Sequence, residues 1–269
     1  NAISACGIKT DIGFREAEGL ASGNYTVIFG PQPVADFLNN LILPSLNAGS
    51  FYGMESPFLG KMGQQIASPL INIYDDAANS QYAGAKGITC EGLPTKRTDL
   101  IKEGIFNDVL SDWYETQRLL HSDPEAEKKL GQDPKTLYRE GKLQPTSGFR
   151  FSTGGGRAYD STPGVAGTNI VLEGTNPEKI EELIKKAANG VYVGAIWYCY
   201  PINGLSAGEF TATIIADSYI IKNGKIVAPL KANAVRINDN FLKILLNIKG
   251  ASDAKKSALP WATDEIPVA

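Results

Sequence analysis

Residues 218–227 read Ser-Tyr-Ile-Ile-Lys-Asn-Gly-Lys-Ile-Val and place Asn223-Gly224 between two runs rich in β-branched residues. A two-residue type I′ turn needs positive φ at both central positions, and Asn followed by Gly tolerates that conformation well. The stretch therefore predicts an antiparallel hairpin. Lys102-Glu103-Gly104 lies between two apolar runs within residues 98–120 and predicts a second hairpin, followed by a short helix or strand.

Four further stretches have the composition of strands, and helical patterns lie between them. The predicted strands are residues 24–29, 70–74, 191–200 and 209–215. The predicted helices are residues 34–44, a weaker pattern at 57–65, residues 177–189 with Asn176 as cap and Pro177 first, and residues 241–248. Because strands and helices do not alternate as βαβ units, the sequence predicts an α+β fold rather than a doubly wound sheet.

Residues 121–145 are charged and contain few large apolar side chains apart from Leu130, Leu137 and Leu143. Such a composition is typical of an exposed segment. We expect a helical excursion or a mobile loop that lies outside the core.

Composition excludes several classes of protein. The 269 residues carry 26 Lys and Arg against 29 Asp and Glu, with no basic block, which disfavours nucleic-acid binding. No apolar stretch approaches the roughly 20 residues that span a bilayer, so no membrane segment is expected. Cys6, Cys90 and Cys199 are odd in number and far apart, which favours a reducing compartment, and we expect a cytoplasmic protein.

Candidates for metal binding are few. The only histidine, His121, lies in the polar excursion, where a solvated side chain is expected. Asp75 and Asp76 end a predicted strand, but neighbouring residues of a strand point to opposite faces, so we expect both acids to be solvated. The sequence therefore predicts no metal site in this chain.

Candidates for nucleophilic catalysis are equally few, and we predict no catalytic residue. Cys199 lies in the aromatic run Trp197-Tyr198-Cys199-Tyr200, which indicates a buried structural thiol, and nothing near Cys90 would lower its pKa. No serine has the surroundings of a nucleophile.

The glycine-rich run Gly154-Gly155-Gly156-Arg157 could present backbone N–H groups to an anion or to a peptide. It matches neither a P-loop nor the dinucleotide-binding pattern. We therefore favour a flexible loop or a close approach of two backbones over an anion site.

A combination of motifs resembles the C-terminal domain of the TldD/PmbA family, also called modulator of DNA gyrase. The motifs are Glu91-Gly92, residues 97–104, Thr168-Asn169 through Gly174, Asn189-Gly190, Gly208-Glu209-Phe210, the hairpin at 219–226, Pro229 and the helix at 240–248. The resemblance implies a β-rich α+β domain with antiparallel hairpins and a few packed helices, acting in proteolysis and peptide maturation. It also implies that residues 1–23 connect to an N-terminal domain, residues 24–250 form the domain, and residues 251–269 are a tail.

Family members of one type carry a His-Glu-x-x-x-His zinc motif after the first strand of this domain and a Cys near its C-terminal end. PmbA-like members lack both and pair with the first type. Here Asn39, Asn40 and Pro44 stand where His, Glu and His are expected, and residues 250–269 contain no Cys.

The resemblance therefore implies a PmbA-like subunit without zinc of its own, which binds unfolded peptide beside a zinc-bearing relative. The alternative is a homo-oligomeric binding or structural protein that kept the fold and lost protease function. A peptidase acting through this chain's own residues is the least favoured reading.

Overall fold

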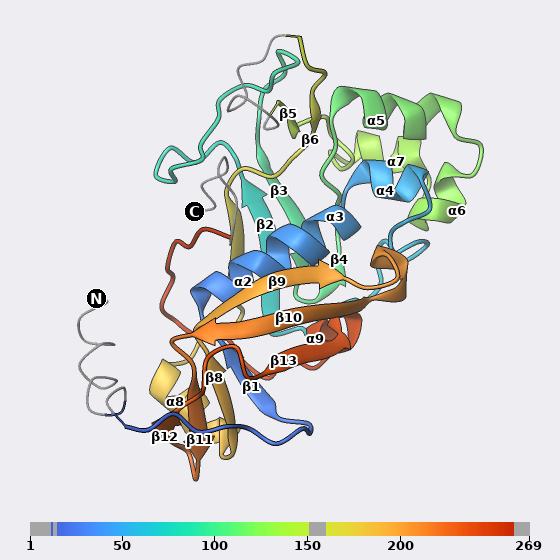
Figure 1. Ribbon diagram of the computed structural model, residues 1–269. Helices are drawn as coiled ribbons and strands as arrows, with labels where there is room; N and C mark the ends of the chain where they lie inside the picture. Colours follow the sequence, from blue (N-terminus) through green and yellow to red (C-terminus); the bar gives the residue numbers. More distant parts are fainter. Residues whose placement is uncertain (1–11, 13–14, 151–159, 261–269) are drawn as a thin grey trace.

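The computed structural model describes residues 12, 15–150 and 160–260, so the predicted loop Gly154–Arg157 and Cys6 lie outside the described residues (Figure 1). The elements of the first half are β1 (Thr26–Phe29), α2 (Pro31–Phe37), the π-helical turn η1 (Leu38–Ile42), α3 (Leu43–Ser45), α4 (Ala48–Tyr52), β2 (Ile71–Asp76), β3 (Arg97–Lys102), β4 (Ile105–Phe106), α5 (Trp113–Gln117), the π-helical turn η2 (Arg118–Ser122), α6 (Ala126–Leu130), α7 (Pro134–Arg139) and β5 (Gly148–Phe149). Those of the second half are β6 (Gly164–Val165), β7 (Ile170–Gly174), α8 (Ile180–Ala187), β8 (Gly190–Val193), β9 (Ala195–Pro201), the 3₁₀ turn η3 (Leu205–Ala207), β10 (Glu209–Ala216), β11 (Tyr219–Lys222), β12 (Lys225–Pro229), β13 (Arg236–Asn240) and α9 (Phe241–Leu246).

The sheets are mainly antiparallel. One sheet has the order β4-β3-β2-β7, a second β13-β10-β9, a third β1-β8-β11-β12, and β5 pairs with β6. The third sheet contains a parallel pair, β1 with β8, in which Thr26 lies beside Gly190. The predicted α+β fold with antiparallel hairpins and a few packed helices is confirmed.

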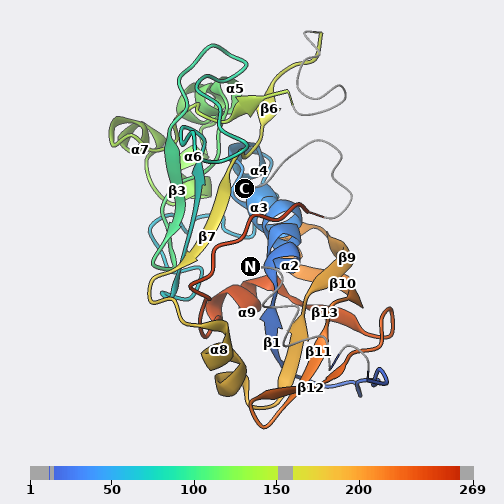
Figure 2. The ribbon, with the colours of Figure 1, turned by 90° about the vertical axis from the view of Figure 1, so that its left-hand side faces the viewer.

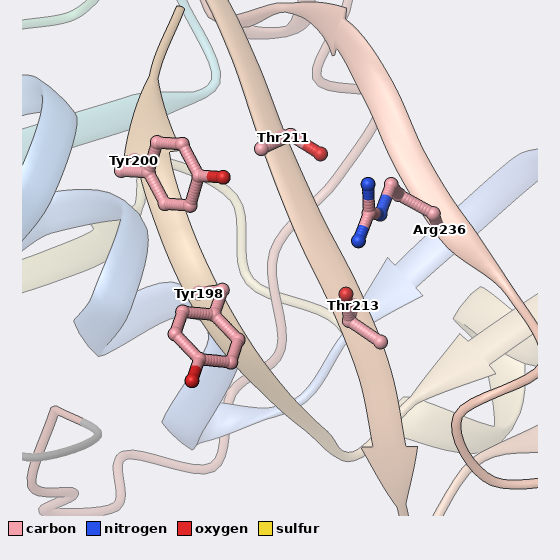
Figure 3. A pocket seen from close by; sticks show the side chains of 5 residues that line it. All are labelled: Tyr198, Tyr200, Thr211, Thr213 and Arg236. Atoms are coloured by element: carbon pink, nitrogen blue, oxygen red, sulfur yellow. The ribbon is translucent and has the colours of Figure 1, made fainter.

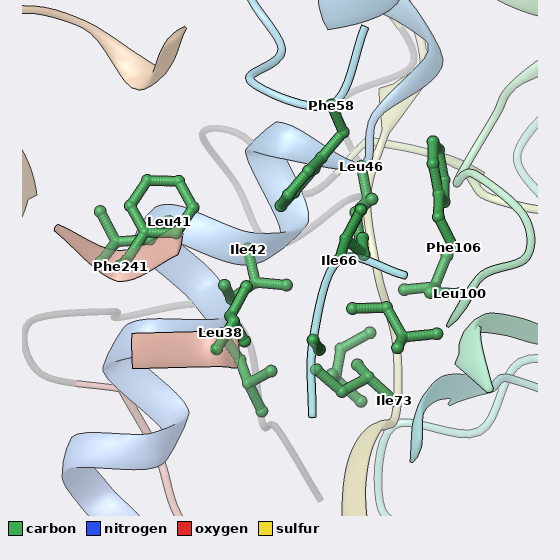
Figure 4. Close-up of a cluster of buried hydrophobic side chains, with 14 of the residues drawn as sticks. Leu38, Leu41, Ile42, Leu46, Phe58, Ile66, Ile73, Leu100, Phe106 and Phe241 are labelled. Atoms are coloured by element: carbon green, nitrogen blue, oxygen red, sulfur yellow. The ribbon is translucent and has the colours of Figure 1, made fainter. Parts of the chain in front are cut away.

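The helical segment α2–η1–α3 runs between two of these sheets. Figures 1 and 2 show it with β2, β3 and β7 on one side and with β9 and β10 on the other. Its residues Leu38, Leu41 and Ile42 belong to one hydrophobic cluster with Ile73 and Leu100 of the first sheet, part of which is seen in Figure 4. Full burial of such a side chain stabilises the fold by about 1.5–3 kcal/mol, so this segment joins the two sheets into one core.

The expectation that residues 121–145 lie outside the core is wrong. The segment is helical, but Leu130, Leu137 and Leu143 are all fully buried in the main cluster. The backbone N–H of Leu143 donates to the Asp108 carboxylate at 2.8 Å. These three leucines pack the segment against the core because they lie on its inward side. The overall composition of the segment does not indicate which side its few apolar residues occupy.

Two helix predictions are also wrong in position. Residues 57–65 form turns, because Gly60 and Gly63 adopt φ of +72° and +81°, and the helix of this region is the earlier α4. Helix α8 begins at Ile180, so Lys179 and not Asn176 occupies the N-cap position, and the Lys179 side chain makes no capping hydrogen bond. The backbone of Glu178 instead pairs with residues 251–253 of the chain.

The predicted strand 191–200 is divided into β8 and β9, which belong to different sheets. Gly194 separates them, and a Cβ atom at this position would collide with the backbone oxygen of Asp217. A glycine therefore lets the chain pass from one sheet to the next at a point where another backbone approaches closely.

Both predicted hairpins are present with the expected turn conformations. Asn223 and Gly224 have φ of 51° and 70°, and Glu103 and Gly104 have φ of 48° and 77°. Among the helices of the described residues, none is long and apolar enough to cross a membrane.

We expect Gly224→Val to destabilise the fold by about 1–3 kcal/mol, because a β-branched side chain is strained at positive φ. A Cβ atom there would also lie 3.1 Å from the Cα of Lys185. Gly87→Val is the control, since Gly87 has open space around it and no positive φ. Chemical denaturation measures both variants, and equal stabilities would contradict the turn.

Asp108 gives the fold a predicted pH dependence. Burial raises the pKa of its carboxyl group from 3.8 to about 6, against the opposing effect of hydrogen bonds from Leu143 and Val109. The folded chain therefore holds this proton more tightly than the unfolded chain. The stability that this provides is present below pH 3.8 and is lost as the pH rises through about 6.

Asp108→Asn keeps an oxygen for the two N–H groups and removes the titration. We expect this variant to be less dependent on pH than the parent between pH 4 and 6, with a difference of about 2 kcal/mol across the interval. Urea denaturation at several pH values measures it. Parallel stability curves for the two proteins would show that Asp108 does not titrate in this way.

Candidate functional site

The resemblance aligns three residues with the zinc motif: Asn39, Asn40 and Pro44. The first two lie on η1, and the third lies in α3, which directly follows η1. Asn39 and Asn40 are half-buried, and the Asn39 Nδ2 donates to the Asn40 Oδ1 at 3.0 Å. The turn is widened, because the N–H of Leu43 donates to the oxygen of Leu38, five residues earlier. Pro44 follows directly, and its ring would clash with the carbonyl four residues earlier in an uninterrupted α-helix.

A widened turn brings residues five apart, rather than four apart, toward the same face of the helix. That is the separation of Asn39 and Pro44. The side chains present do not fit zinc, since an amide cannot lose a proton to become a good ligand and proline offers no donor atom. Asn40 likewise cannot act as a general base.

A polar contact joins α2 to the edge of β9 beside this turn. Gln32 accepts a hydrogen bond from the Ile196 N–H at 2.8 Å and donates to the Ile196 oxygen at 3.1 Å. Its Nε2 also donates to Asp36 at 2.9 Å, and Asp36 is buried. The sequence analysis missed this pair, although the spacing of four residues places Gln32 and Asp36 on one helix face.

The profile of the PmbA/TldA metallopeptidase C-terminal domain matches residues 22–264. The chain belongs to this family. It is 27% identical over 223 residues to an uncharacterized protein of Methanocaldococcus jannaschii, covering 82% of this chain and 45% of the relative. It is 26% identical over 212 residues to a metalloprotease TldD homologue of Buchnera aphidicola, covering 78% of this chain and 37% of the relative.

Among solved structures, the fold is similar to that of TldE from Thermococcus kodakarensis, with a TM-score of 0.66 and 20% identity. The match covers 90% of this chain and 47% of that chain. The chain therefore spans less than half the length of these three proteins.

The cysteine on β9, a strand that contacts the widened turn, is unsuited to nucleophilic or metal chemistry. Cys199 is buried on β9, and burial together with the charge of Asp36 raises the pKa of its thiol to about 12. The thiol is therefore protonated at neutral pH. The prediction of a buried structural thiol in this TldD/PmbA domain is confirmed.

The remaining candidates lie apart from the turn. His121 is exposed at the end of η2, as predicted. Cys90 is half-buried, and its N–H donates to the oxygen of Gly148. Within residues 12, 15–150 and 160–260, no group of three His, Cys, Asp or Glu side chains is arranged to hold a metal ion.

The expectation that Asp75 is solvated is wrong. Its carboxylate is 2% exposed and accepts hydrogen bonds from the Thr168 N–H, the Thr168 hydroxyl and the Asn169 N–H, at 3.0, 2.7 and 2.8 Å. Burial raises the pKa of this carboxyl group, while the three donors oppose the shift. Asp75 therefore ties β2 to the segment that enters β7.

Residues that carry the family resemblance take part in this structural network. The Asn169 side chain accepts from the Gly84 N–H and donates to the oxygen of Asp76. The Glu91 carboxylate accepts from the N–H of Trp113 at the start of α5. These residues of the motifs contribute to the stability of the fold.

We expect Asp75→Ala to destabilise the fold by about 3 kcal/mol, because it leaves three buried donors without an acceptor. Asp76→Ala is the matched control. Asp76 is half-buried and its carboxylate accepts from Asn79, so a loss of about 1 kcal/mol or less is expected. Thermal and urea denaturation compare the two, and equal losses would contradict the role of Asp75.

Proposed function

We propose that this chain is the PmbA-like subunit of a TldD/PmbA-type metalloprotease system. In this role it carries no zinc of its own and works beside a zinc-bearing relative on unfolded peptides in the cytoplasm. The observation that carries the proposal is the chemistry at Asn39, Asn40 and Pro44. Two amides and a proline occupy the positions where the resemblance expects two ligands and a base.

The helix around these three positions supports the proposal that the chain has no zinc site of its own. The helix that holds the three positions is packed between two sheets, and its widened turn is present without groups that could bind a metal. A chain that kept the scaffold for assembly and lost the reactive groups would have this combination. A stable interface with a partner buries upwards of about 1,000 Å².

The test compares cleavage of an unfolded peptide by three samples. These are this chain, a zinc-bearing relative from the same organism with an intact His-Glu-x-x-x-His motif, and their mixture. We expect background cleavage from this chain, and from the mixture a chelator-sensitive rate at least about tenfold above the relative alone, equivalent to about 1.4 kcal/mol in the barrier. Elemental analysis should find zinc in the relative and no stoichiometric zinc in this chain.

Two variants, one in this chain and one in the relative, test which of the two proteins supplies the catalytic groups. Asn40→Ala in this chain should leave the rate of the mixture within about twofold, because Asn40 has no catalytic role in the proposal. Replacing the first histidine of the relative's motif by Ala should abolish cleavage.

Two outcomes would contradict the proposal. Chelator-insensitive cleavage by this chain alone would require a catalytic group of its own. Equal rates for the relative with and without this chain would instead favour the homo-oligomeric binding protein.

A further inference from the structure

The outward face of the sheet β13-β10-β9 contains a small open hollow of about 240 Å³. Figure 3 shows the side chains that line it: Tyr198, Tyr200, Thr211, Thr213 and Arg236. They come from all three strands. The lining combines one guanidinium group, two threonine hydroxyls and two tyrosines, and it includes no acidic side chain.

The strand register explains why these side chains meet. Thr211 lies opposite Tyr200 on one side and Asn238 on the other, and Thr213 lies opposite Arg236. Opposed residues of antiparallel strands project to the same face. The Thr211 hydroxyl donates to the Asn238 oxygen at 2.7 Å, which holds the middle of the face in place.

Tyr198 lies at an irregularity in β9. The register between β9 and β10 shifts between Thr211 and Thr213, and Tyr198 has a φ of 51°. An aromatic residue is strained in this conformation, and such strain is concentrated at functional sites. Tyr198 and Tyr200 are two residues apart on β9, so both side chains lie on the outside, 62% and 49% exposed.

Arg236 is exposed, and within the part of the chain that the structure describes no carboxylate forms an ion pair with it. The two acids of these three strands, Asp239 and Glu209, lie further along the strands and accept hydrogen bonds from other residues. Asp239 accepts from the Asn240 N–H, and Glu209 accepts from the side chain of Asn203. The guanidinium group therefore offers its fork of donors to a ligand, and that fork matches a carboxylate or a phosphate.

We propose that this hollow binds the C-terminal residue of a peptide, with Arg236 and the Thr213 hydroxyl on the terminal carboxylate and the two tyrosine rings against the last side chain. The hollow is smaller than the roughly 300–1,000 Å³ of sites for drug-sized ligands, which suits one residue. The tyrosine rings favour a carboxylate beside an apolar side chain over a bare phosphate ion. The identity of the ligand as a peptide rests on the proposed function.

The test is an NMR titration of this chain with acetyl-glycyl-phenylalanine, with its C-terminal amide and with inorganic phosphate. We expect the carboxylate peptide to bind at least about tenfold more tightly than the amide, because a charge-assisted bidentate contact is lost in the amide. Inorganic phosphate should bind more weakly than the carboxylate peptide and should compete with it.

Variants locate the contact. Arg236→Gln should weaken binding of the carboxylate peptide at least about tenfold and leave binding of the amide unchanged. Arg139→Gln removes the same charge from the exposed helix α7 and should have no effect. Tyr198→Gly should weaken binding while the melting temperature stays equal or rises, because glycine relieves the strain at positive φ.

Three results would overturn the inference: equal affinity for carboxylate and amide, tighter binding of inorganic phosphate than of the peptide, or unchanged binding by Arg236→Gln. The titration uses this chain alone, so it is independent of the mixing experiment. If the mixture shows the enhanced rate but the carboxylate preference is missing, only this inference fails. If the preference is present without the enhanced rate, the proposed partnership fails and the hollow still binds a carboxylate.

Discussion

The burial of one helical segment, residues 31–45, between two sheets is the constraint on which the rest of the structure depends. Leu41 is fully inaccessible, and the segment contacts the β2-containing sheet and the β9-containing sheet at once. A helix buried on two sides can carry polar groups only where they are paired, and Gln32 meets that condition by bonding to Ile196 and Asp36. The same burial explains why the disruption at Pro44 is absorbed within the helix, by a widened turn, and does not end it.

The residues that identify the family and the residues that would perform its chemistry are different sets. Thr168 and Asn169 are held to Asp75, and Glu91 is held to the start of α5. Losing the Asn169 side chain, for example, leaves the buried N–H of Gly84 without its acceptor, which costs the fold stability. Amides at positions 39 and 40 are half-buried and bonded to each other, so they cost the fold little. The scaffold can therefore persist in a chain whose reactive positions have changed.

Features that depend on a few neighbouring residues could be predicted from the sequence, and features set by distant contacts could not. The turns at Asn223-Gly224 and Glu103-Gly104 need only local φ values, and both were predicted. The burial of Leu137 depends on which side of its helix meets the core, and the late start of α8 depends on pairing between Glu178 and residues 251–253. The division of residues 191–200 at Gly194 follows from the approach of Asp217, which no local pattern reports.

The same distinction separates the two sites. Asn39, Asn40 and Pro44 lie on one short stretch of helix, so their relation to a motif of fixed spacing can be read along the chain. The hollow at Arg236 combines side chains of three strands. Alternation along β9 predicts that Tyr198 and Tyr200 share a face, but it does not indicate which strands lie beside them. Tyr198 is strained at positive φ, and Arg236 has no carboxylate partner among the described residues. Such exceptions are expected where a surface is shaped for a ligand, and they support the proposed binding of a peptide carboxylate at the face of β13-β10-β9.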